Sequence, residues 1–386
     1  MENNIDKLFK YLPDKDINWD LINKDLLSPF LKRMQETMQE PTWHAEGDVY
    51  THTKMVCENL IKLDEYIGLT KIEKLVIFLS ALFHDVAKPI CTKIENGKIV
   101  SPKHGPKGAQ IVREYLWTNF SLSGKKEYQE FRESICLLIK FHSLPINSHK
   151  ELLDLKILKI ACSQNLAPYF SNKLLVTLSK ADALGRIGND DETHFNNIAN
   201  YTKRAIQLDC YDKAFNFPSD YTKYQYLNKA KIWYNQELYN PCFGKVIIVC
   251  GLPGTGKDTY IKNNYPNLNM ISLDNIRKEL KIKDNDDQGR VSQEAKNKMK
   301  EYLRSKTPFI FNATNLSTLI RQKYINIIHD YKANVEIIFL ETEYQENLKR
   351  NKERKAYVSE HVINELISKI DIPEVDEAET IKWLCI

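Results

Sequence analysis

The residues best suited to phosphate chemistry form a glycine-rich segment, GLPGTGK, that ends at Lys257 and directly follows the β-branched run Lys245–Cys250. Glycines at this spacing let backbone N–H groups converge on phosphate oxygens at the positive end of the following helix. Lys257 would reach the β- and γ-phosphates. We therefore predict a P-loop that binds ATP (or another NTP) with Mg²⁺ through Gly251, Gly254, Thr255, Gly256, Lys257, Asp258 and Thr259.

This P-loop departs from the usual pattern immediately after the lysine. Asp258 stands where a magnesium-binding Ser or Thr is expected, and Thr259 comes one position later. The strand end that usually supplies an acidic residue offers the neutral Asn312 instead. Because magnesium prefers hard anionic oxygen, we predict that the carboxylate has moved from the strand to the P-loop. The alternative is that Asp258 has no metal-binding role and is merely favoured by the positive end of the helix dipole, and that Thr259 binds the metal ion.

Two further pairs are spaced for phosphoryl transfer. Asp274 is expected at a strand end, with Arg277 three residues later on the same helical face. The carboxylate can accept a proton from an attacking hydroxyl while the arginine orients a phosphate; alternatively, Asp274 caps a helix. Arg350 and Arg354 are four residues apart and share a face, as a lid over ATP phosphates requires. The alternative for this second pair is a solvated helix face.

Histidines concentrate in the first half of the chain, where seven of the nine precede residue 195. The strongest local signal is the His84-Asp85 pair at the end of an apolar helical pattern, since an adjacent imidazole and carboxylate offer ligands to a divalent metal ion. We assign no role to His149 and His194. Four histidines and two aspartates at element faces or ends are expected to converge in a helical bundle as a two-metal site: His52, His84, Asp85, His104, His142 and Asp182.

Two different architectures must position these groups. Helical periodicity dominates the first half, which we predict to be all-α apart from a short hairpin around Cys91–Val100. In the second half, apolar runs alternate with helical patterns, which is typical of a parallel α/β sheet. The predicted domains are a helical bundle over 1–205, a helical connection or linker over 206–243, and an α/β P-loop domain over 244–386. The predicted helices are Tyr50–Ile67, Lys71–His84, Gly108–Phe120, Tyr128–Phe141, Glu151–Cys162 and Leu174–Leu184, and the predicted strands are Lys245–Cys250, Asn269–Leu273, Pro308–Phe311 and Val335–Leu340.

The composition fits a folded protein of two domains. A chain of 386 residues exceeds one ordinary domain, and its hydrophobic fraction of 42% is sufficient for packed cores. The net charge of +4 is compatible with nucleotide or nucleic-acid partners without selecting either. The eight cysteines are scattered without a CxxC pair, which favours a reducing compartment. Because no apolar stretch reaches the length of a membrane span, we expect a soluble, cytoplasmic protein with no membrane partner.

The second half resembles the polynucleotide 5′-kinase branch of P-loop phosphotransferases. The matching pieces are the GLPGTGK segment, the D-x-x-R pair, the NATN strand end and the R-x-x-x-R pair. This resemblance implies that Asp274 is the general base on a polynucleotide 5′-OH and that Arg277 contacts the acceptor. It also implies that Arg350 and Arg354 form the lid, with Arg321 as a weaker candidate for acceptor binding.

The order of histidines and aspartates over residues 41–186 resembles the HD phosphohydrolase superfamily, in its form with a second metal. The resemblance implies a first metal held by His52, His84, Asp85 and Asp182. It implies a second metal held by His104 and His142, with Asp85 bridging; imidazole ligands favour ions of the Mn, Co, Ni and Zn class.

Three further residues of this segment are candidates for contact with the substrate phosphate. Lys88 and Arg186 are expected to contact it, because cations offset the charge of a scissile phosphate. His44 is either an additional ligand or phosphate contact or, equally, a hydrogen-bonded surface histidine.

An HD domain followed by a polynucleotide-kinase-like P-loop domain resembles the bacterial HD-Pnk family of RNA end-healing enzymes. The resemblance implies a kinase that phosphorylates 5′-OH ends and an HD domain that removes a 2′,3′-cyclic phosphate or 2′-phosphate from the other end. The implied partners are RNA (or DNA) ends and an RNA ligase that acts downstream. The alternative is an HD nucleotide phosphohydrolase fused to a nucleoside or metabolite kinase.

Overall fold

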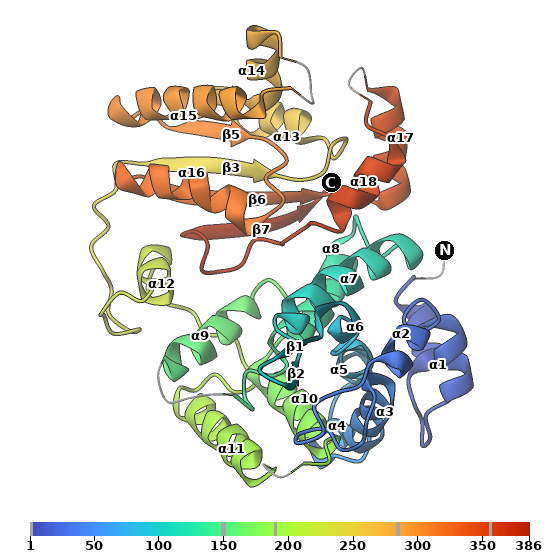
Figure 1. The fold of residues 1–386 in the computed structure, drawn as a ribbon. Coiled ribbons are helices and arrows are strands. Elements are labelled where there is room, and N and C mark those ends of the chain that lie inside the picture. The colour runs from blue at the N-terminus through green and yellow to red at the C-terminus, as the bar shows by residue number, and fades with distance from the viewer. Residues whose placement is uncertain (1–2, 148–151, 189–190, 283–285, 355–356) are drawn as a thin grey trace. The chain divides into compact units, whose positions relative to one another are not determined.

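The computed structural model describes residues 3–147, 152–188, 191–282, 286–354 and 357–386 (Figure 1). The chain divides into two compact units, one made of residues 1–122 and 127–215 and the other of residues 123–126 and 216–386. Residues 206–215 of the predicted connection therefore group with the first unit, and residues 216–243 group with the second. The first unit is helical and the second is α/β, which confirms the predicted fold class.

The first unit is built around α5 (Lys71–Phe83), a helix whose last nine residues are almost all apolar. A capping box between Thr70 and Glu73 starts this helix, and every residue from Leu75 to Phe83 is buried. A helix that is apolar on all sides belongs in the centre of a bundle, and α5 contacts both α3 (Val49–Leu60) and α10 (Asn172–Leu184). The remaining elements are η1 (Asp6–Tyr11), α1 (Trp19–Asp25), α2 (Leu31–Glu36), α4 (Asp64–Ile67), α6 (Lys88–Cys91), β1 (Lys93–Glu95), β2 (Lys98–Val100), α7 (His104–Asn119), α8 (Lys126–Phe141), α9 (Leu153–Ser163) and α11 (Asp191–Gln207).

Most predicted helices of this unit are confirmed, and so is the hairpin, in which β1 and β2 pair antiparallel. The prediction of a single helix over Tyr50–Ile67 was wrong. The structure has α3 and then α4, because Leu63 adopts an extended backbone with ψ of 135° and starts a new helix. Glu151, the predicted start of another helix, lies outside the described residues, and so does His149.

Within the described part of the second unit, five parallel strands form one sheet in the order β4-β5-β3-β6-β7. The P-loop follows β3, the central strand, whose neighbours are β5 and β6. Helix α15 contacts β4, and α16 contacts β6. The elements are α12 (Asp220–Leu227), β3 (Lys245–Cys250), α13 (Lys257–Asn264), β4 (Asn269–Ser272), α14 (Leu273–Leu280), α15 (Gln288–Arg304), β5 (Phe309–Asn312), α16 (Thr318–Asp330), β6 (Asn334–Glu341), α17 (Tyr344–Glu353), α18 (Glu360–Ile367) and β7 (Thr380–Cys385).

The eight cysteines lie in described parts of the chain, and all of them are free thiols. Burial raises the pKa of the Cys136 and Cys250 thiols to about 12, so these two side chains behave as unreactive core residues. Among the described helices, none is long and apolar enough to cross a membrane.

Candidate metal centre and P-loop site

The six predicted metal ligands come from different helices and meet in the interior of the first unit. His52 lies on α3, His84 and Asp85 follow α5, His104 begins α7, His142 follows α8, and Asp182 lies on α10. Five of the six side chains are at most 2% exposed, and that of His104 is 21% exposed. Burial of so many titratable groups at one point is costly unless they are paired or bind metal ions.

Asp85 lies between two groups of histidines. Its Oδ2 is 3.2 Å from Nε2 of His84 and 3.7 Å from Nε2 of His52. Its Oδ1 is 3.4 Å from Nε2 of His104 and 4.0 Å from Nε2 of His142. One carboxylate thus turns one oxygen to each group, which is the geometry that a bridging ligand between two metal ions needs.

The hydrogen bonds of the histidines indicate that cations fit this centre. His84, His104 and His142 each turn Nδ1 to a backbone carbonyl at 2.7 Å, which leaves the lone pair on Nε2. Yet the Nε2 atoms of His104 and His142 are 3.2 Å apart, and those of His52 and His84 are 3.4 Å apart. Oδ2 of the buried Asp85 is paired with Lys88 at 2.7 Å, whereas its Oδ1 has no hydrogen-bond partner. Nε2 lone pairs that face each other at these distances would repel unless a cation lies between them. Divalent metal ions bind such nitrogen and oxygen ligands.

The pKa values of His104 and His142 point in the same direction, whereas the pKa of His52, which burial alone would lower, is raised by hydrogen bonds to Asp182 and Glu46. Burial lowers the pKa of His142 to about 3 and also lowers that of His104, so both are neutral imidazoles, the form that binds metal. Burial alone would raise the pKa of Asp85 and Asp182. The neighbouring His84 and Lys88 for Asp85, and Arg186 for Asp182, instead hold both pKa values well below the ordinary range.

A cavity of about 400 Å³ lies over the second pair of histidines, His104 and His142, which are among its lining residues. The three predicted phosphate contacts line it too. Nζ of Lys88 is 2.7 Å from Asp85 Oδ2, Nη2 of Arg186 is 2.8 Å from Asp182 Oδ2, and the side chain of His44 is 11% exposed. His194, which was assigned no role, also lines this cavity.

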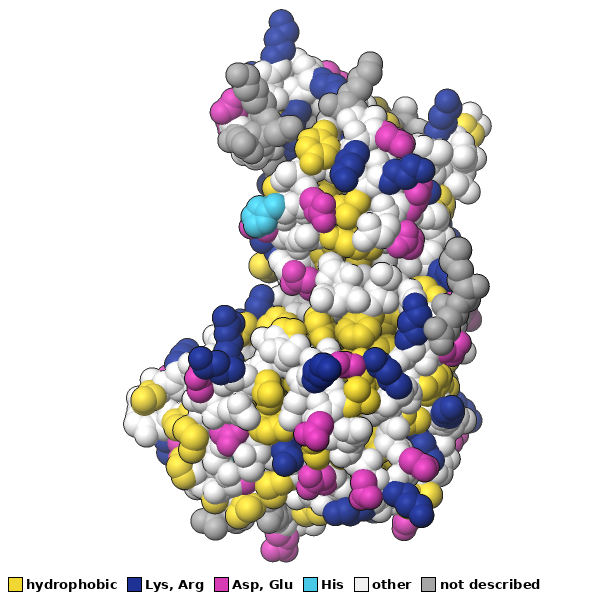
Figure 2. Space-filling view, turned by 90° about the vertical axis from the view of Figure 1, so that its right-hand side faces the viewer, with side chains coloured by type: hydrophobic (Ala, Val, Ile, Leu, Met, Phe, Trp, Pro, Cys, Tyr) yellow, Lys and Arg dark blue, Asp and Glu magenta, His cyan; other side chains and the backbone are white. Residues whose placement is uncertain are grey.

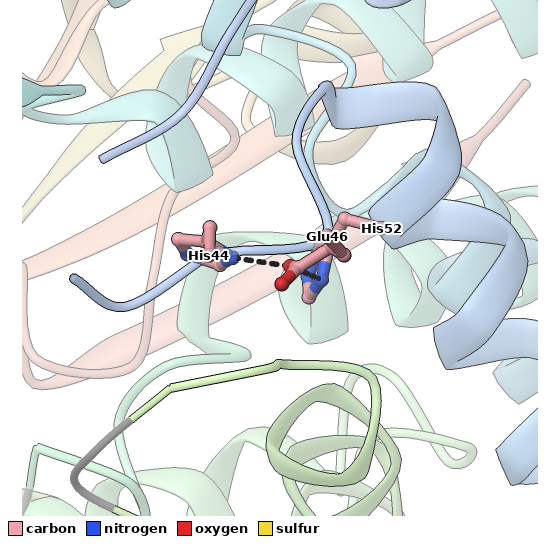
Figure 3. Close-up of side chains that lie close together, drawn as sticks. All are labelled: His44, Glu46 and His52. Atoms are coloured by element: carbon pink, nitrogen blue, oxygen red, sulfur yellow. Dashed lines mark hydrogen bonds and ion pairs between the residues drawn. The ribbon is translucent and has the colours of Figure 1, made fainter. Parts of the chain in front are cut away.

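Three residues around this centre were missed by the sequence analysis. Glu46 Oε1 lies 2.7 Å from His44 Nδ1 and 2.9 Å from His52 Nδ1 (Figure 3). Gln39 accepts a hydrogen bond from Lys88 Nζ at 2.6 Å, and Trp43 lines the cavity. Gln39 and Trp43 carry no pattern that singles them out. For Glu46 the available signal was its place in a polar segment six residues before His52.

The P-loop of the second unit has the conformation that its glycines permit. Gly254 and Gly256 have φ of 85° and 87°, in the left-handed region that favours glycine. The half-buried Lys257 donates hydrogen bonds to the carbonyls of Gly251 at 3.0 Å and Leu252 at 2.8 Å. Desolvation lowers the pKa of Lys257 to about 8, against the opposing charges of two nearby aspartates. The lysine thus lies beside the backbone groups that would surround the phosphates.

Asp258 and Asn312, the two positions of the predicted carboxylate exchange, are in direct contact. Nδ2 of Asn312 donates a hydrogen bond to Oδ1 of Asp258 at 2.6 Å. The buried Oδ1 of Asn312 has no hydrogen-bond partner. A carboxylate and an amide oxygen that lie together at the P-loop are donors that suit Mg²⁺. Thr259 is exposed at the start of the same helix, so its alternative role stays open.

Asp274 and Arg277 share a face of α14 and form an ion pair. Ser272 provides the side-chain cap of this helix, so the alternative in which Asp274 is the cap is wrong. Asp274 is exposed, and its charge raises the pKa of Lys257. Asp274 is therefore near enough to Lys257 for their charges to interact, and its exposed carboxylate is paired with Arg277.

Helix α17, which carries Arg350, packs on the P-loop. The helix ends at Glu353 and Arg354 has an extended backbone with ψ of 147°, so the prediction that the two arginines share a helical face was wrong. Nδ2 of Asn347 donates to the carbonyl of Pro253 at 2.9 Å. Arg350 pairs with Glu346, one turn earlier on the same helix, at 2.8 Å. The charge of Arg354 lowers the pKa of Lys257, so this arginine also lies near the phosphate site.

Arg321 has a different environment from the other predicted site residues. Its side chain is fully buried, and its guanidinium forms two hydrogen bonds of 2.7 Å with Glu377. A third hydrogen bond, of 3.0 Å, goes to the carbonyl of Asn315. Arg321 therefore has no exposed surface to offer an acceptor, and its contacts connect α16 to the segment before β7.

Comparison with known proteins matches the two units separately. Residues 49–164 match the family described as HD domain, and residues 246–373 match the family described as AAA domain. The chain therefore joins an HD domain to a P-loop kinase-like domain. A crystal structure of a gluconokinase from Sinorhizobium meliloti 1021 is similar at 16% identity and a TM-score of 0.28 over 37% of this chain and 83% of that one. That likeness is too low to bear on the substrate.

Proposed function

We propose that this protein repairs RNA ends with two activities. The P-loop unit transfers the γ-phosphate of ATP to a polynucleotide 5′-OH. The HD unit removes a 2′,3′-cyclic phosphate or a 2′-phosphate from the other end. The product, with a 5′-phosphate and free 3′ hydroxyls, is what a ligase requires.

The observation that carries the proposal for the HD unit is the cavity over the ligand cluster. His104 and His142 line this cavity together with the cations Lys88 and Arg186. Divalent metal ions bound by the cluster would activate a water and polarise the phosphate. The chain's own cations, each fixed by a buried aspartate, would orient the phosphate and offset its charge.

The size and lining of the cavity support a nucleotide as its occupant. Small-molecule sites have volumes of roughly 300–1,000 Å³, so a cavity of about 400 Å³ accommodates about one nucleotide. Trp43 lines the cavity and has no aromatic partner among the described residues. An aromatic ring in this situation suits stacking with a base, which is how proteins commonly hold unpaired RNA nucleotides. Trp43 directly precedes His44, so a base and its phosphate would contact adjacent residues.

For the P-loop unit, the support is the group of side chains around Lys257. In the proposed reaction, the 5′-oxygen of the acceptor attacks the γ-phosphorus while the bond to the ADP oxygen breaks. Asp274 accepts the proton of the attacking hydroxyl, and Lys257, Arg350 and Arg354 offset charge on the phosphates. Asp258 and Asn312 would hold Mg²⁺, which supplies further charge neutralisation when bound.

The charge pattern of one face of the molecule is compatible with recognition of RNA ends. On the face shown in Figure 2, Lys and Arg side chains are interspersed with Asp and Glu and form no continuous basic tract. Extended nucleic-acid binding would need clustered positive charge on the binding face. A terminal nucleotide held in a cavity needs only local cations.

The test is one incubation of the purified protein with ATP and an oligoribonucleotide that carries a 5′-OH and a 2′,3′-cyclic phosphate. We expect a 5′-phosphate and a loss of the terminal phosphate, both mapped by mass spectrometry. Parallel reactions with nucleosides, nucleoside monophosphates and gluconate test the rival small-molecule enzyme. Faster turnover of any of these than of the oligoribonucleotide would contradict the proposal.

A further inference from the structure

Glu46 is a buried carboxylate that contacts two histidines at once (Figure 3). Its side chain is 1% exposed, and Oε1 lies within 2.9 Å of Nδ1 of both His44 and His52. Its other oxygen, Oε2, accepts a hydrogen bond from the backbone N–H of Ile187 at 2.9 Å. The carboxylate is thus hydrogen-bonded to His44 and to the backbone of a different segment, and it also lies close to His52 Nδ1.

The contact with His52 sets this histidine apart from the other predicted ligands. His84, His104 and His142 turn Nδ1 to backbone carbonyls. His52 Nδ1 hydrogen-bonds to the carbonyl of Gly185 at 3.1 Å, and the carboxylate of Glu46 lies closer still, at 2.9 Å, as an ion-pair contact. A carboxylate partner at Nδ1 fixes the tautomer with its lone pair on Nε2 and makes that nitrogen a stronger metal ligand.

The contact with His44 has the same consequence for a residue of the cavity wall. Because Nδ1 of His44 donates to Glu46, the acceptor lone pair of this ring is on Nε2. His44 lines the cavity, and the edge of its ring opposite Glu46 is left for an occupant. One carboxylate thereby defines the tautomer of a metal ligand and that of a cavity residue.

The local backbone explains how Glu46 reaches both rings. Gly47 has φ of 106°, and its N–H donates to the carbonyl of His44 at 3.1 Å in a tight turn. Asp48 then caps α3 through Thr51, and His52 follows in the first turn of that helix. The turn places Glu46 between a residue two positions before it and one six positions after it.

We propose that Glu46 is a positioning residue that fixes both imidazoles, so that His52 binds the first metal ion tightly and His44 presents an acceptor to the substrate. The half that concerns His44 rests on the proposed function. The half that concerns His52 requires only that the cluster binds metal. A structural role for Glu46, limited to fastening its turn to Ile187, would predict a loss of stability and no change in metal affinity.

The experiment is a calorimetric titration of the full chain, stripped with EDTA, with Mn²⁺ or Zn²⁺. Glu46→Gln keeps the size and removes the charge. Glu36→Gln removes the same charge from the exposed α2 and is the matched control. We expect the affinity of one metal ion to fall roughly tenfold to a hundredfold in Glu46→Gln, with the second ion bound as in the wild type. Glu36→Gln should titrate like the wild type.

Histidine tautomers give a second measurement that does not depend on metal. In long-range ¹H–¹⁵N NMR spectra of the stripped protein, His44 should show a single Nδ1–H form, which becomes a mixture in Glu46→Gln. Equal metal affinities, or unchanged tautomers, in a folded Glu46→Gln variant would overturn the role of Glu46 alone. Absence of metal binding by the wild-type protein would instead overturn the metal-dependent function on which it stands.

Discussion

The two candidate sites differ in whether side chains or backbone groups form them. The metal centre consists of side chains from five helices that are nearly all buried, each held by a second contact such as the bond from His142 Nδ1 to a carbonyl. The P-loop consists of backbone from seven consecutive residues, with Asp258 and Asp274 exposed beside it. The first site depends on the packing of the whole unit. The second is a local structure that a strand and a helix suffice to position.

We expect the largest effect from removing the metal ions of the HD unit or the histidines that bind them. EDTA should silence the phosphohydrolase, and Mn²⁺, Co²⁺, Ni²⁺ or Zn²⁺ should restore it better than Mg²⁺, because imidazole ligands favour softer ions. The double variant His104→Ala, His142→Ala should lose more than roughly a hundredfold in hydrolysis, since loss of supporting residues alone costs that much. Hydrolysis rates and metal content are the measurements. Full hydrolysis by the double variant would rule out a second metal.

The next prediction tests whether the carboxylate of Asp258 is a magnesium ligand at the P-loop. If Asp258 replaces the acidic residue of the strand, Asp258→Ser should cripple 5′ phosphorylation, because no carboxylate then remains next to Asn312. Adding Asn312→Asp should restore part of the activity. The assay is kinase rate across a magnesium titration. An Asp258→Ser variant with unchanged rate and magnesium dependence would instead favour Thr259 as the metal ligand.

Much of both sites could be predicted from the sequence, because their residues either are contiguous in the chain or occur in a recognisable order. The P-loop is contiguous, and His84-Asp85 ends a helix whose apolar pattern is unmistakable. Glu46 was missed although it stands in a polar segment six residues before His52, because its contacts follow from a turn at Gly47 and from a hydrogen bond donated by the backbone N–H of Ile187. The strand β7 was missed because it is a half-exposed edge strand with a weak apolar pattern.

Arg321 shows the limit of the same reasoning for the kinase half. A cation near a predicted site looks like a ligand contact, but burial against Glu377 was invisible in the sequence. We expect Arg321→Met to destabilise the second unit by about 3–5 kcal/mol, because it leaves a buried carboxylate unpaired. Thermal unfolding measures this, with the apparent KM for the acceptor as the control. A raised KM at unchanged stability would restore Arg321 as an acceptor contact.

We expect a smaller effect of pH on nucleotide binding at the P-loop. The pKa of Lys257 is about 8 in the free protein, mainly because of desolvation, whereas phosphates require its charged form. Above pH 8 the free lysine loses its proton, so nucleotide binding must take one up, and Kd should rise by up to about tenfold per pH unit. Lys257→Arg should abolish this dependence, since arginine stays charged. A wild-type Kd that is flat from pH 7 to 9.5, measured with a non-hydrolysable ATP analogue, would contradict it.

The most direct test of the account is whether the two sites work independently on the two ends of RNA. The wild type, Lys257→Ala and Asp85→Ala are each incubated with ATP and an oligoribonucleotide carrying a 5′-OH and a 2′,3′-cyclic phosphate, and both termini are mapped. We predict that Lys257→Ala loses 5′ phosphorylation and keeps 3′-end hydrolysis, while Asp85→Ala does the reverse. Loss of both activities in either variant, with folding preserved by circular dichroism, would contradict the account.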